Sequence, residues 1–492
     1  MIRAGRRRSI AVIGLVAALA GCAAPLNPKL ASYDGTTGYR YHNLAADAGG
    51  DELFVILAFS GGGTRAAAFS FGVLEGLRAV TYTAPGSSQR RLLDDVDVIS
   101  SVSGGSFTAA YYALFGEAAF DRFGKAFLYR NIQGELIARA LAPWNWPRLA
   151  SPDFSRIDLA AELYDREVFE GATFHALVER GRRPYVILNA TDMTLGARFE
   201  FTQDQFDLLC SNLSGVALGR AVTASSAFPI LLSPLTLRNY AAEGCGYRQP
   251  LWLTNALRPG NPVRRAALVR DLWSYQEHKG DRPFVHLLDG GLSDNIGLRG
   301  PYVALSGQDS AWSVYSLVNA GKIRRVLVIT ANAKTGRDPN WDERRTPPGI
   351  VDAIGLVTTG PMGNYSFETV QLIADHFQAL ARDAQNARDC GALLQRECPN
   401  TTLPAVPVAA QFHAVELSFD GVTGDEKLRR CLEGLATSFS LPDAQVTLLR
   451  QVARHLLMGS AEFRATMRQI DPGWVPPDAP IDPAVRKEAC GL

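Results

Sequence analysis

The sequence carries almost no excess of charge of either sign. Its 492 residues include 50 Lys and Arg against 49 Asp and Glu, which gives a formal net charge of +1. Proteins that bind nucleic acids concentrate positive charge against the phosphates, so this balance gives no support to a nucleic-acid partner. Apolar residues make up 47% of the chain, which is enough for a sizeable core and argues against general disorder.

The sequence also lacks an apolar run of about 20 residues, the length that a membrane helix needs. The apolar run at residues 11–20 is too short, and it follows a basic start with four arginines in residues 3–8. This combination is typical of an export signal. Leu-Ala-Gly-Cys at residues 19–22 resembles a bacterial lipobox, which implies cleavage before Cys22 and lipidation of its sulfur. A plain signal peptide cleaved near Ala24 is the alternative.

Lipidation at Cys22 would tether a soluble body to a bacterial cell envelope, because several acyl chains on one residue anchor stably. Ala23 stands where many lipoproteins of the inner membrane have Asp. Resemblance to sorting in Gram-negative bacteria therefore favours the outer membrane. We expect residues 1–21 to be the signal peptide and residues 22–50 to be a tether leading into the fold.

No two cysteines have Cys-x-x-Cys spacing, which argues against a zinc site. Six cysteines remain once Cys22 is set aside, and an even number in an oxidising compartment indicates disulfides. Closeness in the sequence favours the pairs Cys210–Cys245 and Cys390–Cys398. Free buried cysteines are the alternative.

Short apolar runs with the pattern of buried strands occur at residues 52–60, 96–105, 185–193, 283–291 and 325–333. The first two run into glycines and are followed by helical patterns, and this repeated order indicates a parallel α/β architecture. Further along, we expect a loop at 335–349, a long helix at 365–389, a late strand at 413–421 and a C-terminal helix at 441–458. The late strand could join the same sheet, which argues against a separate second domain.

The second strand ends in Ser101-Val102-Ser103-Gly104-Gly105. This matches the nucleophile elbow G-x-S-x-G, except that Ser101 replaces its first glycine. The elbow uses small residues to form a strained turn that exposes the central serine at the carboxyl edge of the sheet. Ser103 is therefore a candidate nucleophile. The alternative is a helix N-cap at Ser103 or Ser106 without chemistry.

Three consecutive glycines, Gly61, Gly62 and Gly63, end the first strand and open its helix. N–H groups at such a helix start point into the crevice at the sheet edge and could hold a developing oxyanion. A phosphate loop is less favoured: no Walker A pattern occurs, and Ala66 stands where a dinucleotide fingerprint has glycine.

The strand at 283–291 ends in Asp289-Gly290-Gly291. A carboxylate there could enter the same crevice and accept the proton of a serine. The alternative is a β-turn, for which Asp-Gly is common.

Taken in order, Ser-Gly-Gly-Gly-Thr-Arg at 60–65, the elbow at Ser103 and Asp-Gly-Gly at 289–291 resemble the patatin-like phospholipase family. The stretches at 189–201, 221–234 and 289–295 extend the resemblance, which covers roughly residues 54–295. It implies a three-layer α/β/α fold with a mainly parallel central sheet. It also implies that residues 221–234 help to form an acyl pocket wall.

The resemblance implies a Ser–Asp dyad without histidine, with Ser103 as nucleophile and Asp289 as base. It assigns the oxyanion hole to the N–H groups of Gly62, Gly63 and Gly104, and it gives Arg65 the role of bracing the loop. The sequence departs from the family pattern at Ser60, where many members have Asp, at Ala66, where many have Gly, and at Ser101.

We therefore expect a lipid acyl-ester hydrolase of the phospholipase A, lysophospholipase or lipid acyl hydrolase type, with an acyl-enzyme and neither metal nor cofactor. Residues 51–335 would be its catalytic domain and residues 336–492 a mainly helical extension packed on it. The alternatives are a Ser-His-Asp lipase using His376, His413 or His455, a transacylase, and a non-catalytic envelope lipoprotein that binds lipid. His286, three residues before Asp289 on its strand, is expected on the opposite face in a structural role. The sequence does not indicate an oligomeric state.

Overall fold

The computed structural model describes residues 26–45, 52–83, 88–229, 231–256, 258, 263–306, 323–335, 345, 349–398 and 410–492. The expected signal peptide, the lipobox with Cys22 and most of the loop expected at 335–349 lie outside these residues.

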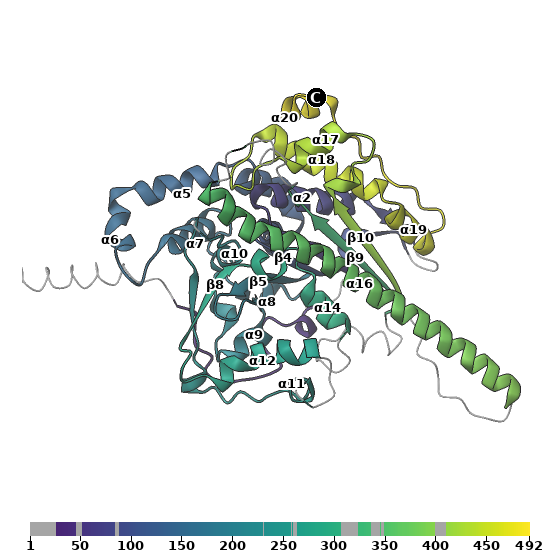
Figure 1. Ribbon diagram of the computed structural model, residues 1–492, viewed down its shortest axis with the longest axis horizontal. Helices are drawn as coiled ribbons and strands as arrows, with labels where there is room; N and C mark the ends of the chain where they lie inside the picture. The colour runs from purple at the N-terminus through teal and green to yellow at the C-terminus, as the bar shows by residue number, and fades with distance from the viewer. Residues whose placement is uncertain are drawn as a thin grey trace, which may run out of the picture.

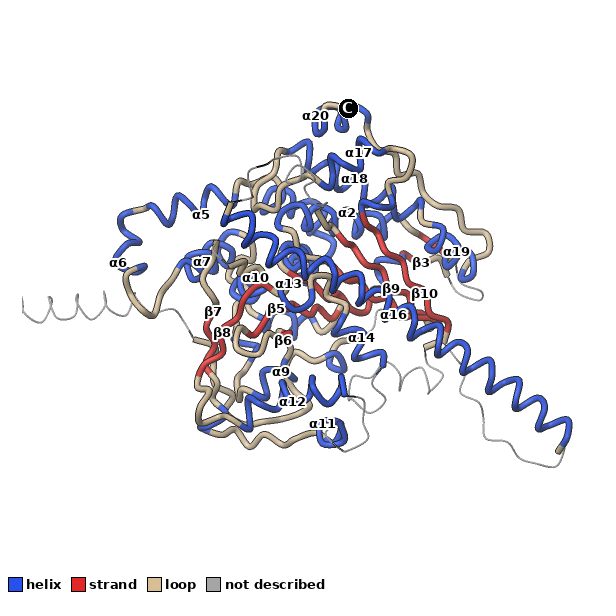
Figure 2. The backbone as a smooth tube through the Cα atoms, in the orientation of Figure 1, coloured by secondary structure: helices blue, strands red, loops and turns tan. Residues whose placement is uncertain are grey.

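One large sheet forms the centre of the molecule. Its strands are β1 (Leu53–Phe59), β4 (Val96–Val102), β5 (Tyr185–Asp192), β6 (Ala197–Glu200), β7 (Leu235–Arg238), β8 (Phe284–Asp289), β9 (Arg325–Asn332) and β10 (Gln411–Ser418). The order is β10-β9-β1-β4-β5-β8-β7, with β6 paired to β5. Figure 2 shows β9 and β10 at one end of the sheet and β7 and β8 at the other. β2 (Thr81–Tyr82) and β3 (Arg90–Arg91) form a separate small ribbon.

The five strands from β10 to β5 are parallel, whereas β8 runs antiparallel to β5 and β7 runs antiparallel to β8. The expectation of a mainly parallel sheet is confirmed. All residues of β4 and β5 are buried, and so are all but the first of β1. Burial on both faces explains why these strands read as continuous apolar runs in the sequence.

Helices cover both faces of the sheet (Figure 1). They are α2 (Gly63–Ala79), α3 (Gly104–Phe115), α4 (Ala119–Phe123), α5 (Ile132–Leu141), α6 (Trp146–Leu149), α7 (Arg156–Glu167), α8 (Phe174–Arg180), α9 (Gln203–Leu208), α10 (Leu218–Ser225), α11 (Leu251–Ala256), α12 (Val263–Glu277), α13 (Gly291–Asp294), α14 (Arg299–Ser306), α16 (Ile350–Glu397), α17 (Glu426–Glu433), α18 (Asp443–Gly459), α19 (Ala461–Ile470) and α20 (Pro483–Cys490). Among the described residues, no helix combines the length and the apolar character that a bilayer span requires.

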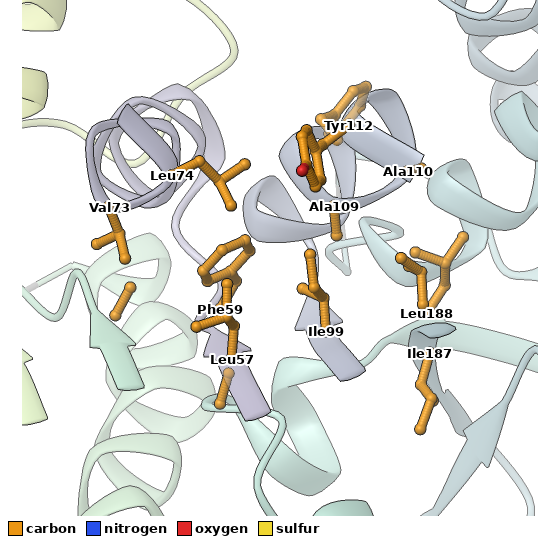
Figure 3. Close-up of a cluster of buried hydrophobic side chains, with 14 of the residues drawn as sticks. Leu57, Phe59, Val73, Leu74, Ile99, Ala109, Ala110, Tyr112, Ile187 and Leu188 are labelled. Atoms are coloured by element: carbon orange, nitrogen blue, oxygen red, sulfur yellow. The ribbon is translucent and has the colours of Figure 1, made fainter. Parts of the chain in front are cut away.

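The core lies between the sheet and these helices. Figure 3 shows Phe59 and Ile99 of the sheet beneath side chains of α2 and α3, such as Leu74 and Ala109. On the other face, α14 lies over Ile56. Residues of α14 and of the neighbouring strands β4 and β5 line the same small cavity as Ile56. Helix, sheet and helix thus form the expected three layers.

The chain after residue 335 continues this same body. β10 pairs with β9 in parallel along its whole length, which confirms the late strand. α18 lies against α2, where a Cβ on Gly72 would come 2.4 Å from the carbonyl oxygen of Arg450. The boundary expected at 335 therefore runs between two neighbouring strands of one sheet. The helix expected at 365–389 is longer, Ile350–Glu397. It begins earlier and continues through glycines and a proline, residue types that are more common in loops.

Two disulfides occur among the described residues. Cys210–Cys245, with Cα atoms 5.6 Å apart, is confirmed. The expected Cys390–Cys398 pair is wrong, since both cysteines are free and exposed. Eight residues along a helix span about 12 Å, whereas a disulfide joins Cα atoms about 4.4–6.8 Å apart. Cys431 of α17 instead pairs with Cys490 of α20, 59 residues away.

Candidate active site

Ser103 lies in the turn between β4 and α3, and its backbone has φ 50° and ψ −120°. A non-glycine residue with positive φ is strained, as the nucleophile elbow requires. Ser103 occupies the N-cap position of α3, yet its side chain makes no capping hydrogen bond. The capping alternative is therefore wrong for Ser103, and the hydroxyl is left for another role.

Buried serines stabilise the elbow through hydrogen bonds. The Ser225 hydroxyl accepts a hydrogen bond from the N–H of Ser103 (2.9 Å) and donates to the carbonyl of Asn189 (2.6 Å). Ser106 Oγ lies 2.9 Å from Ser225 Oγ and donates to Ser101 Oγ (3.2 Å). Ser101, the departure from the motif, thus takes part in a buried polar network that a glycine could not join.

Asp289 ends β8 beside the elbow. Val102 pairs with Asn189 and Asp289 pairs with Ala190 on the strand between them, which brings Ser103 and Asp289 to the same level of β5. The carboxylate of Asp289 is 3% exposed and accepts a hydrogen bond of 2.8 Å from the N–H of Gly291. Burial raises the pKa of Asp289 to about 6, against the lowering effect of hydrogen bonds from Gly291 and the Ser103 side chain.

The three-glycine loop packs directly against the elbow. Gly62 and Gly63 have φ angles of 140° and 58°. A Cβ on Gly104 would lie 2.0 Å from the carbonyl oxygen of Gly63, and a Cβ on Gly61 would lie 2.6 Å from the side-chain oxygen of Asn295 and 3.3 Å from the Cβ of Ser103. Only glycine permits these approaches. Within the described residues, the N–H groups of Gly62, Gly63 and Gly104 have no hydrogen-bond acceptor.

The remaining motif glycines are also at close contacts. A Cβ on Gly105 would lie 2.7 Å from the Cβ of Phe59, and a Cβ on Gly290 would lie 2.2 Å from the carbonyl oxygen of Asn189. These glycines let the elbow and the Asp289 turn sit tightly against the sheet.

Arg65 ties the glycine loop to distant parts of the chain. Its guanidinium donates to the carbonyl of Ala333 (3.0 Å), to the carbonyl of Leu435 and to the hydroxyl of Thr437 (3.0 Å). The side chain is buried, and burial lowers its pKa to about 10. The neighbouring residue, Thr64, contacts the same distant segment, because its N–H donates to the carbonyl of Ser438 (2.8 Å). These contacts agree with a bracing role for Arg65.

A cavity of about 200 Å³ opens above these groups. Its lining comprises Gly61, Gly62, Gly63, Arg65, Ser103, Ser226, Phe228, Leu231, Asp289, Asn295, Ala333, Lys334, Thr335, Thr437, Ser438 and Phe439. Ser103 and Asp289 belong to its polar lining, and Phe228, Leu231 and Phe439 make up its apolar side. Phe228 and Leu231 belong to the stretch that resembled an acyl pocket wall.

Residues 437–439 were not expected at the site. They lie more than 330 residues from Ser103 in the sequence, and no local pattern marks them. Only Arg65 could have suggested them, because a buried guanidinium needs acceptors and none stands near it in the sequence. Asn295 belongs to a recognised motif, and its carbonyl accepts from the N–H of Gly61 (2.9 Å).

None of the seven histidines, all of which the structure describes, lines the cavity. His286 is exposed, with its Nδ1 3.0 Å from Thr236 Oγ1. His455 Nδ1 lies 3.0 Å from the carbonyl oxygen of Ala479. His376 packs against Tyr302 in α14, and His413 lies in β10.

Comparison with known proteins gives one family and several solved structures. A human GIVD cytosolic phospholipase A2 is 16% identical, with 61% of this chain and 50% of that chain covered and a TM-score of 0.31. The same human enzyme with methyl gamma-linolenyl fluorophosphonate is 12% identical, with 85% and 59% covered and a TM-score of 0.36. VipD from Legionella pneumophila is 11% identical, with 91% and 71% covered and a TM-score of 0.29. The chain thus spans about half the length of the human phospholipase.

A comparison with curated proteins finds no match. The sequence pattern of the patatin-like phospholipases, in contrast, matches residues 57–302, which are half of the chain. The match includes the glycine loop, the elbow and the Asp289 turn. The chain therefore belongs to the patatin-like phospholipase family, a family of ester hydrolases, as its motifs predicted.

Proposed function

We propose that the protein is a lipid acyl-ester hydrolase that works through a Ser103–Asp289 dyad. One observation carries the proposal: the Ser103 hydroxyl and the buried Asp289 carboxylate line one cavity together with Gly62 and Gly63, whose N–H groups have no acceptor among the described residues. A nucleophile, its base and donors for an oxyanion are the groups that acyl transfer requires.

In the proposed reaction, Ser103 Oγ attacks the acyl carbonyl carbon while Asp289 accepts the hydroxyl proton. The N–H groups of Gly62, Gly63 and Gly104 donate to the oxygen that becomes negative. Asp289 then gives its proton to the leaving alcohol, which departs and leaves the acyl group on Ser103. Water attacks this ester with Asp289 again as base, and the proton returns to Ser103 as the fatty acid leaves.

The environment of Asp289 suits this role. An ordinary aspartate, with a pKa of about 3.9, is a weak base for a hydroxyl group. Burial raises the pKa of Asp289 to about 6. The carboxylate is then more basic, yet it stays ionised at neutral pH, which is the compromise that general-base catalysis needs.

The cavity supports an acyl substrate. Its apolar side, Phe228, Leu231 and Phe439, lines the same cavity as Ser103 and Asp289. Leu231 is 55% exposed, so the apolar side continues to the surface. An acyl chain could lie along this apolar surface with its ester at Ser103. Phospholipase A and lysophospholipase activities both fit this arrangement.

Two alternatives receive less support. A Ser-His-Asp lipase needs a histidine beside the serine, and no histidine lines the cavity. A lipid-binding protein without catalysis would not require a buried carboxylate in the same cavity as the serine. Both Ser103 and Asp289 are present and adjacent, which favours an enzyme.

Labelling with a fluorophosphonate probe tests the proposal. We expect the wild-type protein to be labelled and Ser103→Ala to remain unlabelled, because the probe reacts with an activated serine. Ser214→Ala, at a serine that does not line the cavity, serves as the serine control and should still be labelled. A folded wild-type protein that takes no label would contradict the enzymatic proposal.

We further propose that the protein is exported and held at the bacterial outer membrane by a lipidated Cys22. The basic and apolar start with Leu-Ala-Gly-Cys supports this, as do two disulfides in the described chain, since disulfides persist in oxidising compartments. We expect Cys22→Ser to abolish incorporation of radiolabelled palmitate and processing at that site, whereas Cys390→Ser changes neither. Lipid incorporation that survives Cys22→Ser would refute the tether.

A further inference from the structure

A projecting arm carries an exposed apolar cluster. The arm consists of α5, a 3₁₀ turn at Pro143–Asn145 and α6, and Figure 1 shows α5 and α6 reaching out from the side of the body. Four large apolar side chains of the arm are exposed: Ile137 by 53%, Leu141 by 67%, Trp144 by 78% and Trp146 by 57%. Such a cluster on a soluble body marks an interaction surface.

The arm has a defined structure. Asn131 caps α5 by accepting from the N–H of Gly134 (2.8 Å), and Asn145 donates to the carbonyl of Arg139 (2.8 Å) across the turn. Arg148 pairs with Glu162 of α7 and lies 3.9 Å over the ring of Phe154. Hydrogen bonds and an ion pair therefore fix the backbone that carries the exposed apolar side chains.

The chemistry of the tip fits a lipid surface. Leu141–Pro147 contains no charged residue and holds two tryptophans. Neither indole belongs to an aromatic pair with another described ring. Tryptophan concentrates at membrane interfaces, where its ring is buried and its N–H stays hydrated. An uncharged, tryptophan-bearing tip can enter this region without burying a charge.

The foot of the arm is joined to the cavity. Gln133, in the first turn of α5, donates from its N–H to the carbonyl of Phe439 (3.2 Å). Its side-chain oxygen accepts from the N–H of Phe439 (3.4 Å). Phe439 forms part of the apolar side of the cavity. A surface that binds the arm would thus lie close to the cavity wall.

The described chain begins on the same edge of the molecule. Asn27 accepts from the N–H of Arg238 (2.7 Å) at one end of β7, an edge strand of the sheet. Near the start of β7, the Ser233 hydroxyl donates to the Ser155 hydroxyl (2.8 Å). Ser155 is the N-cap of α7, the helix that follows the arm in the sequence. Residues 1–25, with the proposed anchor at Cys22, precede this point, so a tether there would draw this edge toward the membrane.

We propose that the arm inserts Ile137, Leu141, Trp144 and Trp146 into the interfacial region of a phospholipid bilayer and holds the cavity at the lipid surface. The role in catalysis rests on the proposed function, whereas insertion itself does not. A second copy of this chain is the competing occupant of the arm.

Quenching by phospholipids brominated in their acyl chains tests insertion. The full chain with Ser103→Ala is used, so that the vesicles, phosphatidylethanolamine with phosphatidylglycerol, stay intact. We expect brominated vesicles to quench tryptophan emission, and Trp144→Phe with Trp146→Phe to remove most of that quenching. The matched control, Trp252→Phe with Trp273→Phe, should keep it. Equal quenching in the arm variant and the unmodified chain would overturn the proposal, whether or not the enzyme is active.

A second set of variants, with Ser103 intact, tests the role in catalysis. Changing Ile137, Leu141 and Trp144 to Ser should lower vesicle hydrolysis about tenfold or more, because each apolar side chain adds to membrane partition. Hydrolysis of a soluble short-chain ester should stay unchanged. Leu251→Ser with Leu393→Ser and Leu394→Ser, at exposed sites elsewhere, is the control and should lower neither rate. A parallel fall of both rates, or a wild-type dimer in sedimentation that the arm variant dissociates, would overturn the proposal. Quenching without any esterase activity would refute only the proposed function.

Discussion

Asp289→Asn is expected to lower kcat by about 10²-fold or more, the usual scale for loss of a general base. Asparagine keeps the shape of the side chain and an oxygen for the N–H of Gly291, which lies 2.8 Å away. It cannot accept the proton of Ser103. The loss should therefore appear in the rate of acyl-ester hydrolysis at unchanged thermal stability, with Km affected less than kcat.

The pH dependence of the wild type should show the same group. Catalysis needs ionised Asp289, and burial raises its pKa to about 6. We therefore expect the rate to fall as pH drops through about 6, at a higher pH than for an ordinary aspartate. The residual activity of Asp289→Asn should lack this acid limb.

Asp294→Asn is the matched control. Asp294 is also buried, its pKa is also raised by burial, and it accepts a hydrogen bond of 2.8 Å from the N–H of Arg299. It does not line the cavity. Asp294→Asn should thus retain most activity, as should His376→Ala, His413→Ala and His455→Ala. An active Asp289→Asn beside a dead histidine variant would place the protein with the triad hydrolases instead.

Gly104→Ala is expected to lower activity by about 10²-fold or more, which is the cost of losing one well-placed oxyanion donor. The added Cβ would lie 2.0 Å from the carbonyl oxygen of Gly63 and 2.8 Å from its nitrogen. The elbow and the glycine loop must therefore separate, which moves the N–H groups of Gly63 and Gly104 relative to Ser103. Because two backbones are displaced, the melting temperature should fall as well.

Gly391→Ala controls for the substitution itself. Gly391 lies in α16, and a Cβ there would meet no atom within 4 Å. The variant should melt at or slightly above the wild-type temperature, since alanine favours a helix by about 0.5–1 kcal/mol over glycine. The rate of fluorophosphonate labelling, measured on the folded fraction, separates a catalytic defect in Gly104→Ala from unfolding. Labelling at the wild-type rate would contradict the close approach of the two backbones.

Local sequence was sufficient for the elements that carry the chemistry. The apolar runs that became β1, β4 and β5 are continuous because both faces of these strands are buried. The glycines at 61–63 and 104–105 are local as well, because positive φ or close backbone contact excludes a side chain at each place. Such constraints act on one residue and its neighbours in the chain, so the local sequence is enough to predict them.

The meeting of Ser103 with Asp289 was expected for a reason that proved incomplete. Carboxyl ends of parallel strands share an edge, but β8 is antiparallel to β5. Asp289 reaches Ser103 because β5 extends beyond the end of β4, and β8 runs back along that extension to Ala190. The direction of a strand depends on the connection that precedes it. The connection between β5 and β8 shows no clear pattern in the sequence, so the antiparallel direction of β8 could not be predicted.

Tertiary structure alone decided the rest of the site. Residues 435–438 supply hydrogen-bond acceptors for Arg65 and Thr64. Cys431 forms a disulfide with Cys490, whereas Cys390 and Cys398 stay free. β10 pairs with β9 and completes the sheet. Each of these contacts joins segments that are far apart in the sequence. Their free energy comes from packing and buried hydrogen bonds between surfaces that exist only once the sheet has formed. A local pattern specifies the backbone that can form at a place, whereas the folded body specifies which distant segment lies against it.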